Sequence, residues 1–215
     1  KSRLPSALLY RCSGGRDQTG LRMRRRHLII FAKPPRLGRV KRRLVADIGT
    51  MEALRFYRRN LAATLRMLGC DPRWQCWLFL DRGAGRWPRN LPRRLQARGD
   101  LGVRMETALR ALPQGSIVLI GSDIPGVSRS DIRHAFRSLG RSDVVFGPAE
   151  DGGFWLVGLA NSRVAPDLFK DIRWSTEHAL ADCIRNLVRQ PSFTAMKCDV
   201  DNGEAYDRLF GAVAS

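Results

Sequence analysis

The chain has 215 residues, enough for one well-filled domain or two small ones, and its hydrophobic fraction of 44% is ordinary for a globular protein. No window approaches the roughly 20 apolar residues of a membrane-spanning helix, and the five cysteines are scattered singly without a Cys-x-x-Cys pair. Together with the missing secretory signal, this predicts a cytoplasmic protein without disulfides or zinc knuckles. The net charge of +18 suggests a nucleic-acid binder at first sight.

Most of that charge lies at the start of the chain. Residues 1–43 hold 14 Lys and Arg and one acid, Asp17, which gives +13 of the +18. No RNA-recognition, zinc-finger or helix-turn-helix signature follows, so nucleic acid stays the weaker alternative to a small anionic substrate. Residues 1–26 are rich in Ser, Gly and Arg without apolar periodicity, and we expect a disordered basic tail that is dispensable for stability. Residues 27–215 are expected to form a single domain.

From His27 onward, short apolar runs alternate with segments of helical periodicity. The first group predicts strands and the second predicts helices. The expected strands are 27–32, 74–80, 116–123, 143–149, 154–160 and 193–200. The expected helices are 50–68 with Thr50 as N-cap, 101–112, 128–139 opened by a Ser128/Asp131 capping box, 175–189, and about 205–210. Residues 34–44 and 81–98 are expected to be loops.

Strands that alternate with helices predict an α/β fold, with a mostly parallel sheet covered on both faces. In such sheets ligands bind outside the carboxyl ends of the strands. Acidic residues and glycines gather at these predicted strand ends, opposite one basic loop, and the sheet edge is therefore the candidate site. Its segments are Lys33–Arg43, Gly99–Met105, Gly121–Pro125, Gly147–Trp155 and Asp199–Asp201.

The residue types at this edge suggest phosphate and metal chemistry. Basic side chains of the 33–43 loop can neutralise phosphates, and Gly38 lets the loop fold closely around them. Asp123 and Asp201 are hard oxygen ligands of the kind that Mg²⁺ or Mn²⁺ takes together with substrate phosphates. A divalent ion held there would stabilise the charge that builds on a leaving group.

Several of these residues also have a purely structural interpretation. Asp123 could cap the turn before Pro125, and Glu150 and Asp151 could be ordinary turn residues. Asp199 and Asp201 share one face of an extended segment, so one could be functional while the other caps the last helix.

Two further residues near this edge, Arg104 and Trp174, also have a purely structural interpretation. Arg104 could lie on a helix surface, and Trp174 could be buried core beside a helix N-cap at Ser175.

The segments LIIFAKPPRLGRVKRRL, GDLGVRM, VLIGSDIPGVS, DVVFGPAEDGGFWLVGL, LFKDIRWST and DVDNGEAYDRL, in this order, resemble the selenodomain-associated transferase family, type one. That glycosyltransferase-like group resembles the GT-A nucleotide-diphospho-sugar transferases, which include nucleotidyltransferases of molybdenum-cofactor assembly. The resemblance covers residues 28 to about 210. It implies a GT-A three-layer sandwich with a mostly parallel mixed sheet, and a nucleotide bound over the first strand's loop.

The resemblance also implies roles for individual residues. The catalytic residues would be Asp123, Asp151 and Lys41, and the metal ligands for Mg²⁺ or Mn²⁺ would be Asp123 and Asp201. Nucleotide and phosphate binding would fall to Ala32, Lys33, Gly38, Lys41, Arg43, Asp100, Arg104, Gly152 and Gly153.

The sequence also departs from the family pattern. Arg42 stands where the family commonly has a small hydroxyl residue, and Phe154 replaces a tyrosine. Glycosyltransferases of this fold usually carry Asp-x-Asp, whereas Gly121-Ser122-Asp123 supplies one acid.

The expected function is a metal-dependent transferase that uses a nucleotide-activated donor and an unknown acceptor. A glycosyltransferase acting on a nucleotide sugar is the first reading. A nucleotidyltransferase that releases pyrophosphate, which the single acid favours, is the alternative. The third is a non-catalytic nucleotide-binding protein. The sequence leaves the oligomeric state open.

Overall fold

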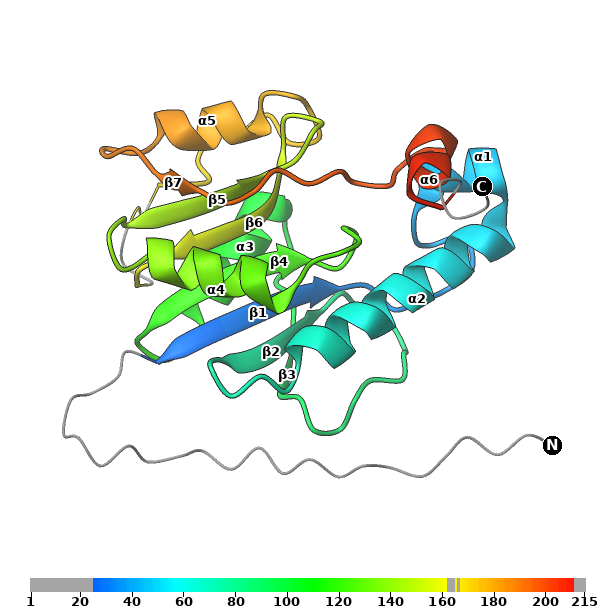
Figure 1. Cartoon of the computed structure of the whole chain (residues 1–215), viewed down its shortest axis with the longest axis horizontal. Coiled ribbons are helices and arrows are strands. Elements are labelled where there is room, and N and C mark those ends of the chain that lie inside the picture. The colour runs from blue at the N-terminus through cyan, green and yellow to red at the C-terminus, as the bar shows by residue number, and fades with distance from the viewer. Residues whose placement is uncertain (1–24, 162–164, 166, 211–215) are drawn as a thin grey trace.

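The computed structural model describes residues 25–161, 165 and 167–210, which form one sheet between two layers of helices (Figure 1). Within these residues the sheet has seven strands in the order β3-β2-β1-β4-β6-β5-β7. The strands are β1 Arg26–Ala32, β2 Gln75–Leu80, β3 Arg93–Leu95, β4 Ser116–Gly121, β5 Val144–Pro148, β6 Phe154–Leu159 and β7 Ser192–Phe193. The helices are α1 Arg42–Ile48, α2 Thr50–Leu68, α3 Leu101–Arg110, α4 Arg129–Ser138, α5 Ala179–Arg185 and α6 Gly203–Phe210.

The sheet is mixed but mostly parallel, which confirms the predicted fold class. Strand β1 pairs in parallel with β2 and β4, and β3 and β7 extend the sheet in parallel with β2 and β5. Within the described part of the chain, β6 alone runs antiparallel, between β4 and β5. The carboxyl ends of β1, β2, β4 and β5 therefore meet at one edge of the sheet.

Side chains of β1 alternate between the two helical layers, as the period of a strand requires. Leu28 and Ile30 pack into the cluster that contains residues of α2 and α4. Ile29 and Phe31 pack on the opposite face with residues of α3 and α5. Burial on both faces explains the unbroken apolar sequence of this strand.

A third, smaller cluster lies at the end of the molecule where α1, α2 and α6 meet (Figure 1). Leu44 from α1 and Phe56 from α2 are buried there against Val200 and Ala205. The predicted loop 34–44 therefore runs into helix α1 at Arg42, and α1 packs against Val200 and Ala205.

Two further departures from the predicted elements have local causes. Strand β3 lies in the predicted loop 81–98, and all three of its residues are exposed, so no apolar pattern marks it. Helix α5 begins only at Ala179, after a turn in which Ser175, the predicted N-cap, has a left-handed backbone with φ of 62°.

The predicted last strand is also much shorter than expected. It is reduced to β7 and one isolated bridge between Ala149 and Lys197, and the rest of the segment up to Asp201 is extended along the sheet edge. We call residues 194–201 the strap.

Strand β1 starts at Arg26, the last residue of the predicted tail. Arg25 precedes it, and residues 1–24 of that tail lie outside the described residues. In the part of the chain that the structure describes, no helix combines the length and the apolar character needed to cross a membrane.

The predicted capping box at the start of α4 is confirmed. The Asp131 amide donates to Ser128 Oγ at 3.3 Å, and the Ser128 amide donates to Asp131 Oδ2 at 2.8 Å.

Ser128→Ala should therefore lower the free energy of unfolding by about 1 kcal/mol, measured by urea denaturation. Ser130→Ala, at an exposed position of the same helix, is the control. An equal loss in both variants would show that the cap contributes nothing.

Candidate active site

A cavity of about 420 Å³ opens at the carboxyl ends of β1 and β4. It is large enough for a small ligand, since such pockets usually measure roughly 300–1,000 Å³. Its walls come from all five segments that the sequence placed at this edge, because the parallel strands end together. The predicted residues that line it are Lys33, Arg104, Asp123, Asp151 and Gly153, joined by Asp199, Phe154, Trp174, Ser175 and Thr176.

Beside the cavity, Lys41 is buried among carboxylates. Its Nζ donates to Asp199 Oδ1 at 2.6 Å and to Asp201 Oδ1 at 3.0 Å, and its side chain is only 3% exposed. Lys41 has a left-handed backbone with φ of 47° where α1 begins, an uncommon conformation for a residue with a side chain. The loop after β1 is thus tied to the strap.

The charges of Lys41 and the neighbouring aspartates shift one another's pKa values. Burial alone would lower the pKa of Lys41, but the negative charges of Asp123, Asp199 and Asp201 outweigh it and raise that pKa. Burial raises the pKa of Asp199 to about 6, and Asp201 and Asp123 add to the rise while Lys41 opposes it. One lysine therefore faces more negative charge than it can balance, and the group can accept further positive charge.

Asp123 lies near Lys41 and Asp199, and its carboxylate accepts no hydrogen bond from any described residue. It follows Gly121-Ser122 at the end of β4, is half-buried and lines the cavity. Among the described residues, no group donates a hydrogen bond to its carboxylate, so it does not cap the turn before Pro125. A half-buried carboxylate that no structural role occupies is a candidate ligand for a cation or substrate.

The two residues of the strap differ in position. Asp199 lines the cavity, whereas Asp201 is the more exposed of the two and lies 3.9 Å from Arg43. Neither caps the last helix, because the side chain of Asn202 accepts the Ala205 amide at the start of α6. The expectation that one of the two aspartates caps this helix is wrong.

A hydroxyl from α2 joins the ends of β1 and β4, and sequence reasoning missed it. Tyr57 Oη accepts the Lys33 amide at 2.9 Å, donates to the Lys33 carbonyl at 3.0 Å and lies 3.1 Å from Ser122 Oγ. Asn60, also on α2, donates to the Ser122 carbonyl at 2.8 Å. Tyr57 is fully buried, and its helical spacing predicts only a core residue. The polar Asn60, buried one turn later on α2, is the sequence feature that could have indicated a hydrogen-bond network here.

Arg104 belongs to the cavity and not to the helix surface. It lines the cavity, donates to Gln96 Oε1 and lies 3.9 Å from Asp81. Gln96 is itself fixed, because its Nε2 donates to the Phe79 carbonyl at 2.7 Å. The buried Nε of Arg104 has no hydrogen-bond partner among the described residues.

The turn after β5 fits closely against the segment before α5. Gly152 has φ of +80°, and a Cβ placed there would lie 2.2 Å from the Glu177 carbonyl oxygen, so only glycine fits. Asp151 Oδ1 accepts the Gly153 amide at 3.0 Å while also lining the cavity. Gly152 is thus a packing residue, and Asp151 combines a turn with a position in the cavity wall.

Trp174 forms part of the cavity wall and is therefore not simply a core residue. Its ring contacts those of Phe154 and Phe169. The preceding Arg173 binds the buried Asp182 of α5 through its amide and its guanidinium, at 2.8 to 3.1 Å. This pairing fixes the segment that presents Trp174 to the cavity.

The remaining predicted residues lie around the cavity and do not line it. Asp100 caps α3 by accepting the Val103 amide at 2.9 Å. Ala32 is buried at the end of β1, and Gly38 is exposed with φ of +68°. Arg43 is exposed, and among the described residues its one ion-pair partner is Asp201, at 3.9 Å.

A family model matches residues 57–176, which is more than half of the chain, and its description reads "Uncharacterized protein conserved in bacteria (DUF2064)". The chain belongs to this family. Of the residues around the cavity, the matched range contains Tyr57 and Asn60 of α2, Arg104, Asp123, Gly152 and Trp174. No curated protein matches the chain in sequence.

Solved structures with this fold include nucleotide-using enzymes. A protein from Desulfovibrio desulfuricans, provisionally named a nucleotide-diphospho-sugar transferase, is 26% identical with a TM-score of 0.79, and the match covers 88% of each chain. The 4-diphosphocytidyl-2C-methyl-D-erythritol synthase of Anaerococcus prevotii is 9% identical with a TM-score of 0.58, covering 89% of this chain and 99% of that one.

A Mycobacterium tuberculosis protein solved in complex with manganese shares the fold as well. It is 17% identical with a TM-score of 0.54, covering 87% of this chain and 98% of the other. The fold is thus that of nucleotide-diphospho-sugar transferases and cytidylyltransferases.

The first prediction from this site concerns Asp199. Its pKa of about 6 in the folded protein exceeds the ordinary value of 3.8, so the folded chain loses stability as pH rises from about 4 to about 6. Asp199→Asn removes this penalty and should raise the free energy of unfolding by about 1–2 kcal/mol at pH 7.5, with no gain at pH 3.5. Urea denaturation in EDTA at both pH values measures the effect.

The matched control is Asp201→Asn, which removes the more exposed partner of the same Lys41 and should not reproduce the gain. A loss of stability in Asp199→Asn at pH 7.5 would show that its pairing with Lys41 outweighs the cost of burying the charge.

The second prediction concerns the Tyr57 hydroxyl. Tyr57→Phe removes the partner of both Lys33 backbone groups and should cost about 1–3 kcal/mol of folding stability. Hydrogen exchange of the Lys33 amide should also accelerate. Tyr206→Phe, which removes a hydroxyl bonded to Glu52 at 3.3 Å, is the control and should leave that amide protected. An unchanged exchange rate at Lys33 in Tyr57→Phe would contradict the assigned role.

Proposed function

We propose that the protein is a metal-dependent transferase that binds a nucleotide-activated donor in the cavity at the ends of β1 and β4, and that it transfers a glycosyl group. The observation that carries the proposal is Asp123, a cavity carboxylate without a hydrogen-bond donor among the described residues, beside the ion-pair group of Lys41. The solved relative at 26% identity supports the choice of donor.

Two cations of the cavity wall are placed to bind donor phosphates. Lys33 follows β1 directly, and Arg104 approaches from α3. Arginine binds phosphate through paired N–H donors, and Gln96 holds the guanidinium of Arg104 in place. Lys41 has a different role in this arrangement, because Asp199 and Asp201 already hold its ammonium group. It keeps the two strap carboxylates together beside the cavity.

The carboxylates fit a Mg²⁺ or Mn²⁺ ion that also binds the donor. Among the described residues, no three His, Cys, Asp or Glu side chains form a metal site on their own. Mg²⁺ commonly needs only one or two carboxylates when substrate phosphates complete its shell. Asp123 and Asp199, which both line the cavity, are the proposed ligands, with Asp201 behind them on Lys41. When bound, such an ion would stabilise negative charge on the leaving phosphate.

A nucleotidyltransferase is the second candidate, and one observation favours it. The end of β4 offers a single carboxylate, because Gly121 stands two residues before Asp123. The Asp-x-Asp pair usual in glycosyltransferases of this fold is therefore replaced by one ligand from this strand. In this alternative the protein would join a nucleoside monophosphate to a phosphorylated acceptor and release pyrophosphate.

The test of the shared proposal is Asp123→Asn. Manganese binding in the presence of a nucleotide should weaken at least tenfold by calorimetric titration, while the melting temperature stays within a few degrees. Asp100→Asn is the matched control, because asparagine also caps helices and Asp100 does not line the cavity. Unchanged manganese affinity in Asp123→Asn would overturn the metal assignment.

Product analysis separates the two candidates. Mass spectrometry with a panel of nucleotide sugars and nucleoside triphosphates should show a nucleoside diphosphate for glycosyl transfer and pyrophosphate for nucleotidyl transfer. Binding of nucleotide without either product, across the panel with varied acceptors, would support a non-catalytic nucleotide-binding protein.

A further inference from the structure

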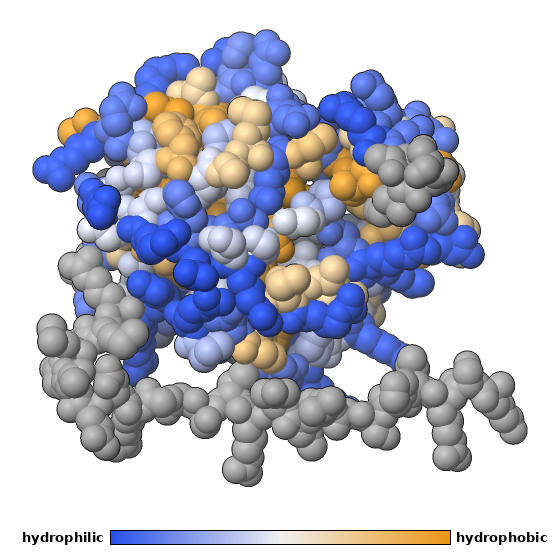
Figure 2. All heavy atoms as spheres, in the orientation of Figure 1, coloured by the Kyte–Doolittle hydropathy of each residue, from blue (hydrophilic) through white to orange (hydrophobic). Residues whose placement is uncertain are grey.

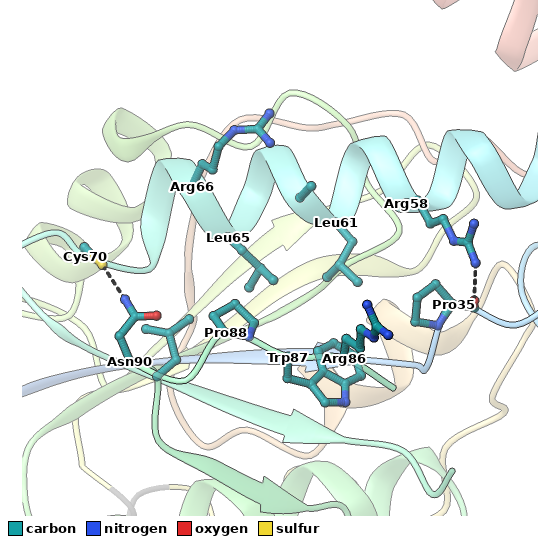
Figure 3. A pocket seen from close by; sticks show the side chains of 12 residues that line it. Pro35, Arg58, Leu61, Leu65, Arg66, Cys70, Arg86, Trp87, Pro88 and Asn90 are labelled. Carbon is teal, nitrogen blue, oxygen red and sulfur yellow. Dashed lines mark hydrogen bonds between the residues drawn. The ribbon is translucent and has the colours of Figure 1, made fainter. Parts of the chain in front are cut away.

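A second pocket, separate from the cavity described above, lies between α2 and the loop that follows β2. Its volume is about 460 Å³, and none of its lining residues lines the first cavity. Figure 3 shows Leu61 and Leu65 pointing from α2 toward Trp87 and Pro88 on the loop. We call this pocket the α2 groove. It is within the size range of pockets that bind small molecules.

The floor and walls of the groove are apolar. Leu61 and Leu91 are buried, and Leu65 and Trp87 are partly buried against the core. The face seen in Figure 2 is otherwise mostly hydrophilic, with apolar residues confined to smaller areas. Such a lining favours an apolar ligand body, because contact removes apolar surface from water at about 25 cal/mol per Å².

The groove is elongated along α2. Arg58 and Arg66 both line it and are eight residues apart on this helix, which corresponds to about 12 Å. At the end near the helix C-terminus, Asn90 donates to Cys70 Sγ at 3.1 Å and joins loop to helix. A linear chain fits this shape better than a compact ring.

The other end of the groove is cationic. Arg58 and Arg86 lie at Pro35, where Arg58 donates to the Pro35 carbonyl at 3.4 Å, whereas Arg66 points away from the groove (Figure 3). None of the described residues that line the groove is acidic. Arg58 and Arg86 form no ion pair with any other described residue. Two unneutralised guanidinium groups at one end would bind a phosphate strongly.

Charge argues against two other occupants. Residues 1–24 contain six Lys and Arg and a single acid, Asp17, so the groove's arginines would repel that segment of the chain. A second copy of a chain with net charge +18 is disfavoured for the same reason. The complementary partner carries negative charge on an apolar body.

We propose that the α2 groove binds a small amphiphile, a linear aliphatic chain that ends in a phosphate monoester. The phosphate lies between Arg58 and Arg86 beside Pro35, and the chain follows Leu61, Leu65 and Trp87 along α2. This site is independent of the cavity at the sheet edge and does not rest on the function proposed for it.

Calorimetric titration of the full chain with decyl phosphate, below its micelle concentration, tests the proposal. One equivalent should bind, and inorganic phosphate and decyl maltoside should each bind at least tenfold more weakly, because each lacks one half of the recognised chemistry. Ala62→Trp, which fills the groove, should weaken binding at least tenfold. Ala63→Trp, at the exposed neighbouring position, should not.

A charge-matched pair of variants tests the arginines. The double variant Arg58→Glu, Arg86→Glu should weaken decyl phosphate binding at least tenfold. The double variant Arg133→Glu, Arg141→Glu changes the net charge equally at exposed positions outside the groove and should bind normally. Equal losses in both double variants, equal losses in the two tryptophan variants, or equal affinity for decyl maltoside would each overturn the proposal.

Discussion

The buried ammonium group of Lys41 links the parts of the molecule on which the candidate site depends. It joins the loop after β1 to the strap, 158 residues further along the chain, through two carboxylates. Burying a lysine costs several kcal/mol unless its charge is paired, so Lys41 can stay buried only while the strap carboxylates lie beside it. Such a pair contributes little net stability but restricts the chain to one arrangement of the site. The apolar cluster of α1, α2 and α6 supports the same connection on its other side.

The sheet supplies a second constraint. Because β1, β4 and β5 run in the same direction, their following loops converge at one edge, and β6 enters from that edge without displacing them. The Tyr57 hydroxyl then fixes the ends of β1 and β4 relative to each other. The direction of the strands therefore brings these loops to one edge, and a few buried polar groups fix their positions more closely.

Much of this organisation could be predicted from sequence, for identifiable reasons. The central strands are buried on both faces, so apolar runs such as residues 27–32 identify them, and strand ends then place Lys33 and Asp123 correctly. Strand β3 was missed because its exposed residues carry no apolar pattern. Tyr57 was read as core because a hydroxyl's partner lies far away in sequence. The different positions of Asp199 and Asp201 could not be predicted, since both depend on pairing with Lys41, 158 and 160 residues earlier in the chain.

The position of the strap near the end of the chain has a consequence for biogenesis. During translation the β1 loop leaves the ribosome early, whereas Asp199 and Asp201 follow only after more than 150 further residues. Until then, Lys41 lacks the two carboxylates that hold it. The sheet core can begin to form around β1, β2 and β4 while the site stays incomplete. Synthesis thus imposes an order in which the sheet forms before the candidate site, and a nascent chain stalled before the strap would lack both carboxylates that hold Lys41.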